Sequence, residues 1–357
     1  MFDHPSFASH ERVLWHEHSE SGLRAIIALH DTTLGPAAGG LRRWHYADDF
    51  AALDDVLRLS RGMTYKNALA GLPFGGGKAV ILADEPATEA QLHAFGELVE
   101  SLGGRYVTAE DVGVNVADLR CVAQRTDYVS GVATAAGGDP SPWTARGVVQ
   151  GIRAAVGFID PTRDLDDLRV GIQGLGNVGF ETARLLREAG ARLVAADLDK
   201  DKRERAADEL GAELVPVDEI VSQPVDVFVP CALGGVLTCD SVSRLQANVV
   251  AGAANNQLFD AAAGTALMRR GILYAPDYVI NAGGIISVAR EYLGEGDVAQ
   301  LARAVDRIGE RLLEIFERAQ RAKRPSNLEA DQMAERILDA ARGEAPAQAP
   351  LRPVRVA

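Results

Sequence analysis

The chain has 357 residues, of which 47% are hydrophobic and 24% charged, a length and composition typical of a globular protein with two domains. Its net charge of -13 argues against nucleic acid and against an anionic membrane as the main partner, although a local group of lysines could still bind a small anion. The three cysteines are widely spaced and match no metal-binding pattern, which favours reduced thiols in a cytoplasmic protein. We expect no signal peptide, no membrane span and no metal.

The N-terminal part of the chain alternates between apolar runs and helical patterns. Buried strands are expected at 23–29, 79–82 and 105–108, and helices at 49–66 and 92–102. This alternation predicts an α/β domain, in which functional side chains commonly lie beyond the carboxyl ends of strands. Asp111 follows the third strand and falls at such a position.

Lys66 and Lys78 lie twelve residues apart in the stretch 62–78, with three glycines directly before the second lysine. Three glycines in a row are unfavourable inside a helix or strand, so they predict a tight turn or a close approach to the backbone. A lysine pair at such a segment could bind an anion, and one lysine could act as a base if its pKa were lowered. A loop with two solvated lysines is the alternative.

The second half of the chain contains a nucleotide-binding pattern. The composition shifts to Gly, Ala, Pro, Ser and Asp at 131–142, which indicates a hinge. A strand expected at 168–173 is followed by GLGNVG at 174–179, and the next strand ends at Asp197. Strand, glycines, helix and acid stand in the Rossmann order. A P-loop is excluded, since alanine follows Lys78.

The glycine motif assigns a separate part in NAD binding to each residue. Gly174 would form the turn, Gly176 would let the backbone approach the pyrophosphate, and Gly179 would allow close packing of helix on strand. The helix N-terminus, at Asn177 and Val178, would face the phosphates.

Three further positions are expected to line the cofactor cleft. Asp197 would accept hydrogen bonds from the adenosine ribose and repel a 2′-phosphate, which favours NAD over NADP. Cys231 and Ala232 follow an expected strand at 225–229, and Asn256 follows another at 248–251. Cys231 is interpreted as a buried structural thiol, since no histidine is evidently paired with it.

Seven motifs in one order give the chain a family resemblance. They are AIIALHDTTLGPAAGG (25–40), GMTYKNALAGLPFGGGK (62–78), YVTAEDVG (106–113), GLGNVG (174–179), PCALGG (230–235), AGAANNQL (251–258) and YAPDYVINAGG (274–284). With them the chain resembles the Glu/Leu/Phe/Val dehydrogenase family over almost its whole length, with the leucine dehydrogenases as the nearest branch. The resemblance implies a cytoplasmic homo-oligomer, either a dimer or an octamer.

The resemblance also implies roles for the charged residues. Lys66 would pair with the substrate α-carboxylate, Lys78 would be the general base or electrophile that acts on the attacking water, and Asp111 would exchange a proton with the amino group. A lysine becomes a base near neutral pH when burial and a neighbouring cation lower its pKa, and Lys66 could be that cation. Leu41-Arg42-Arg43 departs from the family, in which Thr-Arg is common after the two glycines.

Further residues would contact the substrate and the nicotinamide by the same resemblance. Asn256 would hold the substrate and the nicotinamide ribose, and Thr144 would lie near the nicotinamide amide. The other expected substrate contacts are Gly39, Gly40 and four apolar residues that line the side-chain pocket, namely Ala38, Ala109, Ile285 and Val288. A glutamate γ-carboxylate would be buried without a partner in such a pocket, so glutamate is not expected as the substrate.

The sequence thus predicts an NAD-dependent L-amino acid dehydrogenase of the leucine type with two α/β domains. An amino-acid-dehydrogenase-like catalytic domain is expected at 1–135 and a Rossmann NAD-binding domain at 136–325. Residues 326–357 would form a helix and tail that return to the first domain or to a subunit interface. Phenylalanine or valine dehydrogenase and a non-catalytic NAD-binding sensor are the alternatives.

Overall fold

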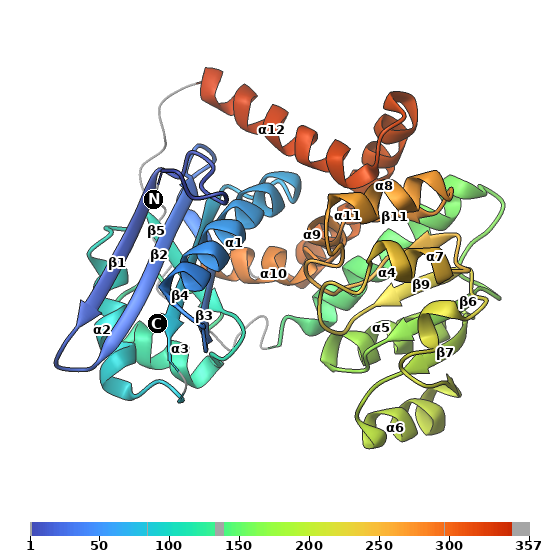
Figure 1. Ribbon diagram of the computed structural model, residues 1–357, viewed down its shortest axis with the longest axis horizontal. Coiled ribbons are helices and arrows are strands. Elements are labelled where there is room, and N and C mark those ends of the chain that lie inside the picture. Colours follow the sequence, from blue (N-terminus) through green and yellow to red (C-terminus); the bar gives the residue numbers. More distant parts are fainter. Residues whose placement is uncertain (1, 84, 133–138, 296, 345–357) are drawn as a thin grey trace. The chain divides into compact units, whose positions relative to one another are not determined.

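The computed structural model describes residues 2–83, 85–132, 139–295 and 297–344, and it divides the chain into two compact units (Figure 1). The first unit contains the described residues of Met1–Gly138, Ser287–Val298 and Ala334–Ala357, and the second contains Asp139–Ile286 and Ala299–Met333. The domain boundary expected at 135/136, the middle of the expected hinge and the tail from 345 lie outside the described residues.

The first unit is built on a five-stranded mixed sheet in the order β1-β2-β4-β3-β5. β1 and β4 run antiparallel to β2, whereas β3 runs parallel to both β4 and β5. The strands are β1 (Arg12–His18), β2 (Leu23–Asp31), β3 (Ala37–Trp44), β4 (Gly75–Leu82) and β5 (Tyr106–Glu110). β2 is buried along most of its length, as its apolar sequence predicts.

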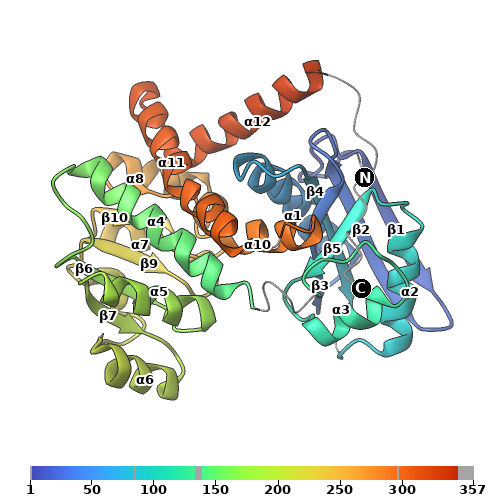
Figure 2. The same ribbon diagram turned by 180° about the vertical axis from the view of Figure 1, so that it is seen from behind.

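Helices cover both faces of this sheet (Figures 1 and 2). α1 (Asp49–Leu69) begins after Asp48, whose side chain accepts from the Ala51 backbone N–H, and it packs apolar residues against β2 and β4 on one face. α2 (Glu89–Glu100) and α3 (Val116–Ala123) pack against the other face. Ala28, which lies in the α1-side core, is the register partner of Lys78. The Lys78 side chain is therefore on the face that α1 covers.

The three glycines before Lys78 lie inside β4. The tight turn that the sequence suggested there is wrong, and the close approach is made by α1. A Cβ atom at Gly76 would lie 2.1 Å from both the backbone nitrogen and Oγ1 of Thr64, a distance that real Cβ atoms do not reach. Gly76 thus sets how closely α1 packs on the sheet.

The second unit is built on a parallel sheet in the order β11-β10-β9-β6-β7-β8. Its strands are β6 (Arg169–Gln173), β7 (Arg192–Ala196), β8 (Glu213–Leu214), β9 (Val227–Pro230), β10 (Val249–Val250) and β11 (Leu273–Tyr274). Chain order reverses between β6 and β9, as in a Rossmann domain, whose ligands bind beyond the carboxyl ends of the strands at this point. The two-domain α/β fold predicted from the sequence is confirmed.

Helices and one 3₁₀ turn precede, connect and follow these strands along the chain. They are α4 (Ser141–Ile159), α5 (Asn177–Glu188), α6 (Lys200–Leu210), η1 (Ile220–Ser222), α7 (Cys239–Arg244), α8 (Ala261–Arg269), α9 (Asp277–Ile280) and α11 (Val298–Ala322). α11 has buried residues at helical spacing along one face, such as Leu301, Val305, Ile308 and Leu312.

Two helices pass from one unit to the other along the chain: α10 (Gly283–Tyr292) and α12 (Ser326–Glu344). The sequence analysis placed 287–298 in the second domain, whereas the structure groups this segment with the first unit. There Ser130 Oγ donates to the Val288 carbonyl at 2.9 Å, and the Phe74 and Tyr292 rings are 5.9 Å apart between centroids. From Ala334 onward α12 also belongs to the first unit.

Among the described residues, none of the helices combines the length and the apolar character needed to cross a bilayer.

Candidate active site

Lys78 and Asp111 form a buried ion pair in the first unit. Lys78 is on β4, and Asp111 directly follows β5, with β3 between the two strands. Lys78 Nζ is 2.8 Å from Asp111 Oδ2, and the two side chains are 6% and 19% exposed. Gly40 on β3 leaves room for this arrangement, because a Cβ atom there would lie 2.8 Å from the Asp111 Cβ. The sheet thus brings together two residues that the sequence places 33 positions apart.

Arg42 places a second cation on the same carboxylate. Its Nε donates to Asp111 Oδ2 at 2.9 Å, and its Nη1 donates to Asp55 Oδ2 at 2.9 Å. Tyr46 donates its hydroxyl to the same Asp55 oxygen at 2.7 Å. The sequence analysis treated Arg42 only as part of a departure from the family pattern, and it did not consider Asp55 or Tyr46. One signal was present: Arg42 lies two positions after Gly40 on a strand and so shares its face.

The surroundings of the pair lower both pKa values, that of Lys78 and that of Asp111. Burial lowers the pKa of Lys78 from its usual 10.5; Asp111 opposes this shift and Arg42 adds to it. Burial alone would raise the pKa of Asp111, but Lys78 and Arg42 together outweigh it, so the pKa lies below the usual value. The sequence analysis named Lys66 as the cation that could lower the pKa of Lys78. In the structure Arg42 lowers it, and the effect of Lys66 stays a prediction.

The other expected substrate contacts of the first unit lie on α1, β3 and β5. Lys66 is in the last turn of α1, two residues beyond Thr64. Ala38 and Ala109 have their side chains on the face that carries Lys78, because Ala38 pairs with Gly76 and Ala109 pairs with Gly40.

Gly39 has a packing constraint of its own. A Cβ atom at this position would lie 1.8 Å from the Gly77 carbonyl oxygen, and the Gly39 carbonyl accepts from the Tyr106 hydroxyl at 2.7 Å. Only glycine fits this position of β3.

The glycine motif of the second unit has the geometry of a phosphate site. Gly174 has a φ of 96° at the turn after β6, and a Cβ atom at Gly179 would lie 2.0 Å from the Gly174 carbonyl oxygen. Gly176, the N-cap of α5, has nothing within 4 Å of a Cβ position, and no side chain caps the helix. The N–H groups at Asn177 and Val178 therefore begin a helix that is open to an anion such as a pyrophosphate.

The neighbouring strand ends complete this part of the second unit. A Cβ atom at Gly174 would lie 2.7 Å from the Ala232 backbone nitrogen, so the turns after β6 and β9 are in contact. The Cys231 N–H donates to the Gln173 carbonyl at 2.7 Å. Burial raises the pKa of the Cys231 thiol to about 11, which keeps it protonated at neutral pH and fits a structural thiol.

Asp197 lies directly after β7 and ties the glycine turn to that strand. Its Oδ2 accepts from the Leu175 N–H at 2.6 Å, and its Oδ1 accepts from the Asp199 N–H at 2.8 Å. A carboxylate fixed beside the glycine turn is suited to accept from ribose hydroxyls and to repel a 2′-phosphate.

We expect Asp197→Ser to raise the ratio of NADP to NAD efficiency, measured as kcat/KM, by about tenfold or more, because it removes one negative charge from the ribose position. Asp201→Asn is the matched control, since Asp201 is exposed in the first turn of α6 and should leave the ratio unchanged. An unchanged ratio in Asp197→Ser would show that another group selects the cofactor.

The remaining expected contacts lie on α4, on a loop after β10 and on α10. Thr144 lies in the first turn of α4, and its hydroxyl would be 2.7 Å from a Cβ atom at Gly284. Asn256 has a φ of 52°, a left-handed conformation that asparagine tolerates, and its N–H donates to Asp277 Oδ2 at 2.5 Å. Ile285 belongs to the second unit and Val288 to the first.

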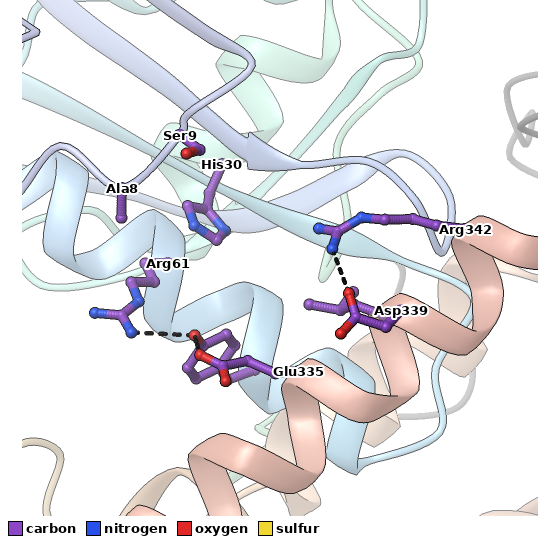
Figure 3. A pocket seen from close by; sticks show the side chains of 9 residues that line it. Ala8, Ser9, His30, Arg61, Glu335, Asp339 and Arg342 are labelled. Atoms are coloured by element: carbon purple, nitrogen blue, oxygen red, sulfur yellow. Dashed lines mark hydrogen bonds and ion pairs between the residues drawn. The ribbon is translucent and has the colours of Figure 1, made fainter.

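A cavity of about 360 Å³ in the first unit contains none of the expected site residues (Figure 3). Its lining residues are Ala8, Ser9, His30, Arg61, Tyr65, Glu335, Leu338, Asp339 and Arg342. Charged groups here bond to one another: Arg61 donates to the Tyr65 hydroxyl at 3.1 Å, which donates to Glu335 at 2.9 Å, and Arg342 is 2.8 Å from Asp339. The Tyr65–Glu335 hydrogen bond at this cavity joins α1 to the second half of α12. Among the lining residues we find no lysine–carboxylate pair comparable to Lys78–Asp111.

Fold, buried pair and comparisons with known proteins together define an NAD-binding amino acid dehydrogenase. Residues 10–128 match the family model of the Glu/Leu/Phe/Val dehydrogenase dimerisation domain, and residues 197–340 match that of Glutamate/Leucine/Phenylalanine/Valine dehydrogenase. Residues 155–234 match the NAD-binding domain of D-isomer specific 2-hydroxyacid dehydrogenases. The chain belongs to the Glu/Leu/Phe/Val dehydrogenase family, which confirms the resemblance and NAD as the cofactor.

Relatives with different amino acids in their names are almost equally similar. Leucine dehydrogenase of Thermoactinomyces intermedius is 46% identical over 95% of this chain and 93% of its own. Phenylalanine dehydrogenase of Bacillus thermotolerans is 44% identical over 87% and 84%. The crystal structure of L-tryptophan dehydrogenase from Nostoc punctiforme, 44% identical, superposes with a TM-score of 0.84 over 94% of this chain and 98% of that one. Identity alone therefore establishes the family and not the amino acid.

Proposed function

We propose that this protein catalyses the reversible, NAD-dependent oxidative deamination of a branched-chain aliphatic L-amino acid, with leucine preferred and valine and isoleucine accepted. Cα loses a hydride, the oxygen of one water becomes the carbonyl oxygen of the 2-oxo acid, and ammonium and one proton are released. The observation that carries this proposal is the buried Lys78–Asp111 pair, with Nζ and Oδ2 2.8 Å apart on the closely packed face of the sheet.

NAD supplies the hydride acceptor when it is bound. The chain's own groups would do the rest: Lys66 pairs with the α-carboxylate, and Lys78, whose pKa is lowered mainly by burial, removes a proton from the water that attacks the iminium carbon. Asp111 exchanges a proton with the nitrogen. Its Oδ2 is used by Lys78 and Arg42, whereas its Oδ1 has no hydrogen-bond partner in the part of the chain that the structure describes, so Oδ1 is the atom we assign to the amino group.

The apolar side chains expected around the substrate support an aliphatic amino acid. Ala38 and Ala109 lie on the same sheet face as Lys78, and neither offers a partner for a second carboxylate. Burial of an unpaired charge is costly, which disfavours glutamate. Ile285 and Val288 would add branched apolar surface.

An aromatic L-amino acid is the second candidate. Ala38 and Ala109 are small, and two relatives at 44–45% identity are named for tryptophan and phenylalanine. One methylene group in such a pocket changes discrimination by only about 1–3 kcal/mol, so a few side chains decide the preference.

The test follows NADH formation by purified protein with leucine, valine, isoleucine, phenylalanine, tryptophan and glutamate. We expect the highest kcat/KM for leucine and none measurable for glutamate. Fastest turnover with phenylalanine or tryptophan would replace the aliphatic assignment by the aromatic one. Binding of NAD without turnover of any amino acid would instead support a non-catalytic sensor.

We further infer a homo-oligomer, a dimer or an octamer, since the matched N-terminal model is described as a dimerisation domain. Light scattering should give a multiple of the chain mass of 38.0 kDa, and a monomer would contradict this inference. A cytoplasmic location remains our expectation from the cysteine content.

A further inference from the structure

Five polar side chains from separate elements form one continuous network around Asp111. Lys78 Nζ and Arg42 Nε both contact Asp111 Oδ2, at 2.8 and 2.9 Å. Arg42 Nη1 and the Tyr46 hydroxyl both donate to Asp55 Oδ2, at 2.9 and 2.7 Å. Arg42 is therefore held by two carboxylates, one on each side of its guanidinium, and its side chain is only 19% exposed.

We propose that Arg42 is a positioning residue for amino acid deamination, which holds Asp111 as an oriented anion whether or not Lys78 carries its proton, with Asp55 and Tyr46 fixing Arg42 in place. The proposal rests on the function proposed above. It assigns no contact between Arg42 and the substrate.

The chemical need for such a residue follows from the role of Lys78. A base must alternate between its charged and neutral forms, and a buried carboxylate whose only partner loses its charge becomes costly or takes up a proton itself. An arginine remains charged throughout the accessible pH range, so it keeps a counter-charge on Asp111 when Lys78 is neutral. Because Arg42 and Lys78 use the same oxygen, Oδ1 keeps one direction toward the substrate nitrogen.

Arg42 also contributes to the ease with which Lys78 loses its proton. Burial is the largest cause of the lowered pKa of Lys78, Asp111 opposes it, and Arg42 acts in the same direction as burial while Asp55 opposes. The titratable groups around the pair are thus Arg42 from β3, Asp55 from α1 and Tyr46 from the connection between them, and Asp111 in turn raises the pKa of Tyr106 on β5. Arg42 and Asp55 shift the pKa of Lys78 in opposite directions, which makes their effects separable.

The test is an NMR titration of Lys78, which is practicable because the chain has only five lysines. In protein labelled with ¹³C-lysine, the Lys78 signal is assigned by its absence from Lys78→Met and titrated directly by NMR. We expect Arg42→Gln to raise the pKa of Lys78 by about 1 unit, because a cation beside it is removed, and Arg42→Lys to leave it within a few tenths. Arg24→Gln is the matched control, since Arg24 also joins a strand to an aspartate of α1 but is 53% exposed.

The turnover number kcat is the second measurement, and it reports the orientation of Asp111 apart from its charge. Arg42→Lys keeps the charge but cannot bridge two carboxylates, so kcat should fall by about tenfold or more with the pH profile nearly unmoved. Asp55→Asn should lower the pKa of Lys78 and nevertheless lower kcat, because Arg42 loses the partner that fixes it. A pKa of Lys78 unchanged in Arg42→Gln, or normal kcat in both Arg42→Lys and Asp55→Asn, would overturn the proposal. Absence of turnover in the wild type would contradict the proposed function. The NMR titration does not depend on turnover, so it would still measure the effect of the Arg42 charge on Lys78.

Discussion

Lys78→Met is expected to reduce kcat for oxidative deamination by about 10³-fold, because the proposed base beside Asp111 is replaced by an apolar side chain of similar length. NAD binding should be unchanged, since the glycine turn that we assign to the cofactor lies in the second unit. The measurement is NADH formation at saturating amino acid, with NAD affinity determined by fluorescence titration.

The pH profile gives an independent check on Lys78. Its pKa lies below 10.5, so the neutral form is present at lower pH than for an ordinary lysine, and the wild-type rate should rise with pH as this proton is lost. This rise of the rate with pH should vanish in Lys78→Met and persist in the control Lys323→Asn. Lys323 is exposed and has a positive φ, which asparagine tolerates. A rate near that of the wild type in Lys78→Met would exclude Lys78 as the base.

Asp111→Asn is expected to reduce kcat by about 10²-fold or more and to lower the free energy of unfolding by about 3 kcal/mol at neutral pH. The kinetic effect arises because an amide cannot take a proton from the substrate nitrogen. The loss of stability arises because Lys78, only 6% exposed, would hold its charge without a carboxylate.

The stability deficit of Asp111→Asn should depend on pH with a defined sign. Lys78 has a lower pKa in the folded chain than the 10.5 of an unfolded one, so the folded state gives up the proton first. The penalty is fully present below the folded pKa and shrinks as pH rises toward 10.5. Urea unfolding at neutral and alkaline pH measures this, with Asp49→Asn, which breaks the exposed pair with Arg24, as a control of small effect. A deficit that grows with pH would contradict the assignment.

Local rules were sufficient for the parts of the structure that depend on neighbouring residues. The roles of Gly174 and Gly179 follow from their places between a strand and a helix, and the structure has a turn at Gly174, with positive φ, and close packing at Gly179. Lys66 near the end of α1 followed from an apolar periodicity that continues up to it.

What the sequence did not reveal depends on strand order. Arg42 reaches Asp111 only because β3 lies between β4 and β5, and no spacing in the sequence encodes that order. The glycines at 75–77 were ambiguous for a similar reason: glycine permits a turn and equally permits a helix to approach a strand, and only the position of α1 decides between them. The structure groups 287–298 with the first unit and not, as the sequence analysis did, with the second domain, because α10 continues as one helix from the second unit into the first.

The close packing of α1 on the sheet also bears on how a member of this family could change its preferred amino acid substrate. One helix carries both Asp55, which holds Arg42, and Lys66, our proposed carboxylate anchor, roughly 16 Å apart along its axis. A larger residue at Gly76 would displace the helix and disturb both together. Ala38 and Ala109, our proposed pocket residues, project from β3 and β5 and not from α1. If the proposed roles hold, we expect substitutions at these alanines to alter substrate preference with less effect on Asp55 and Lys66 than a substitution at Gly76.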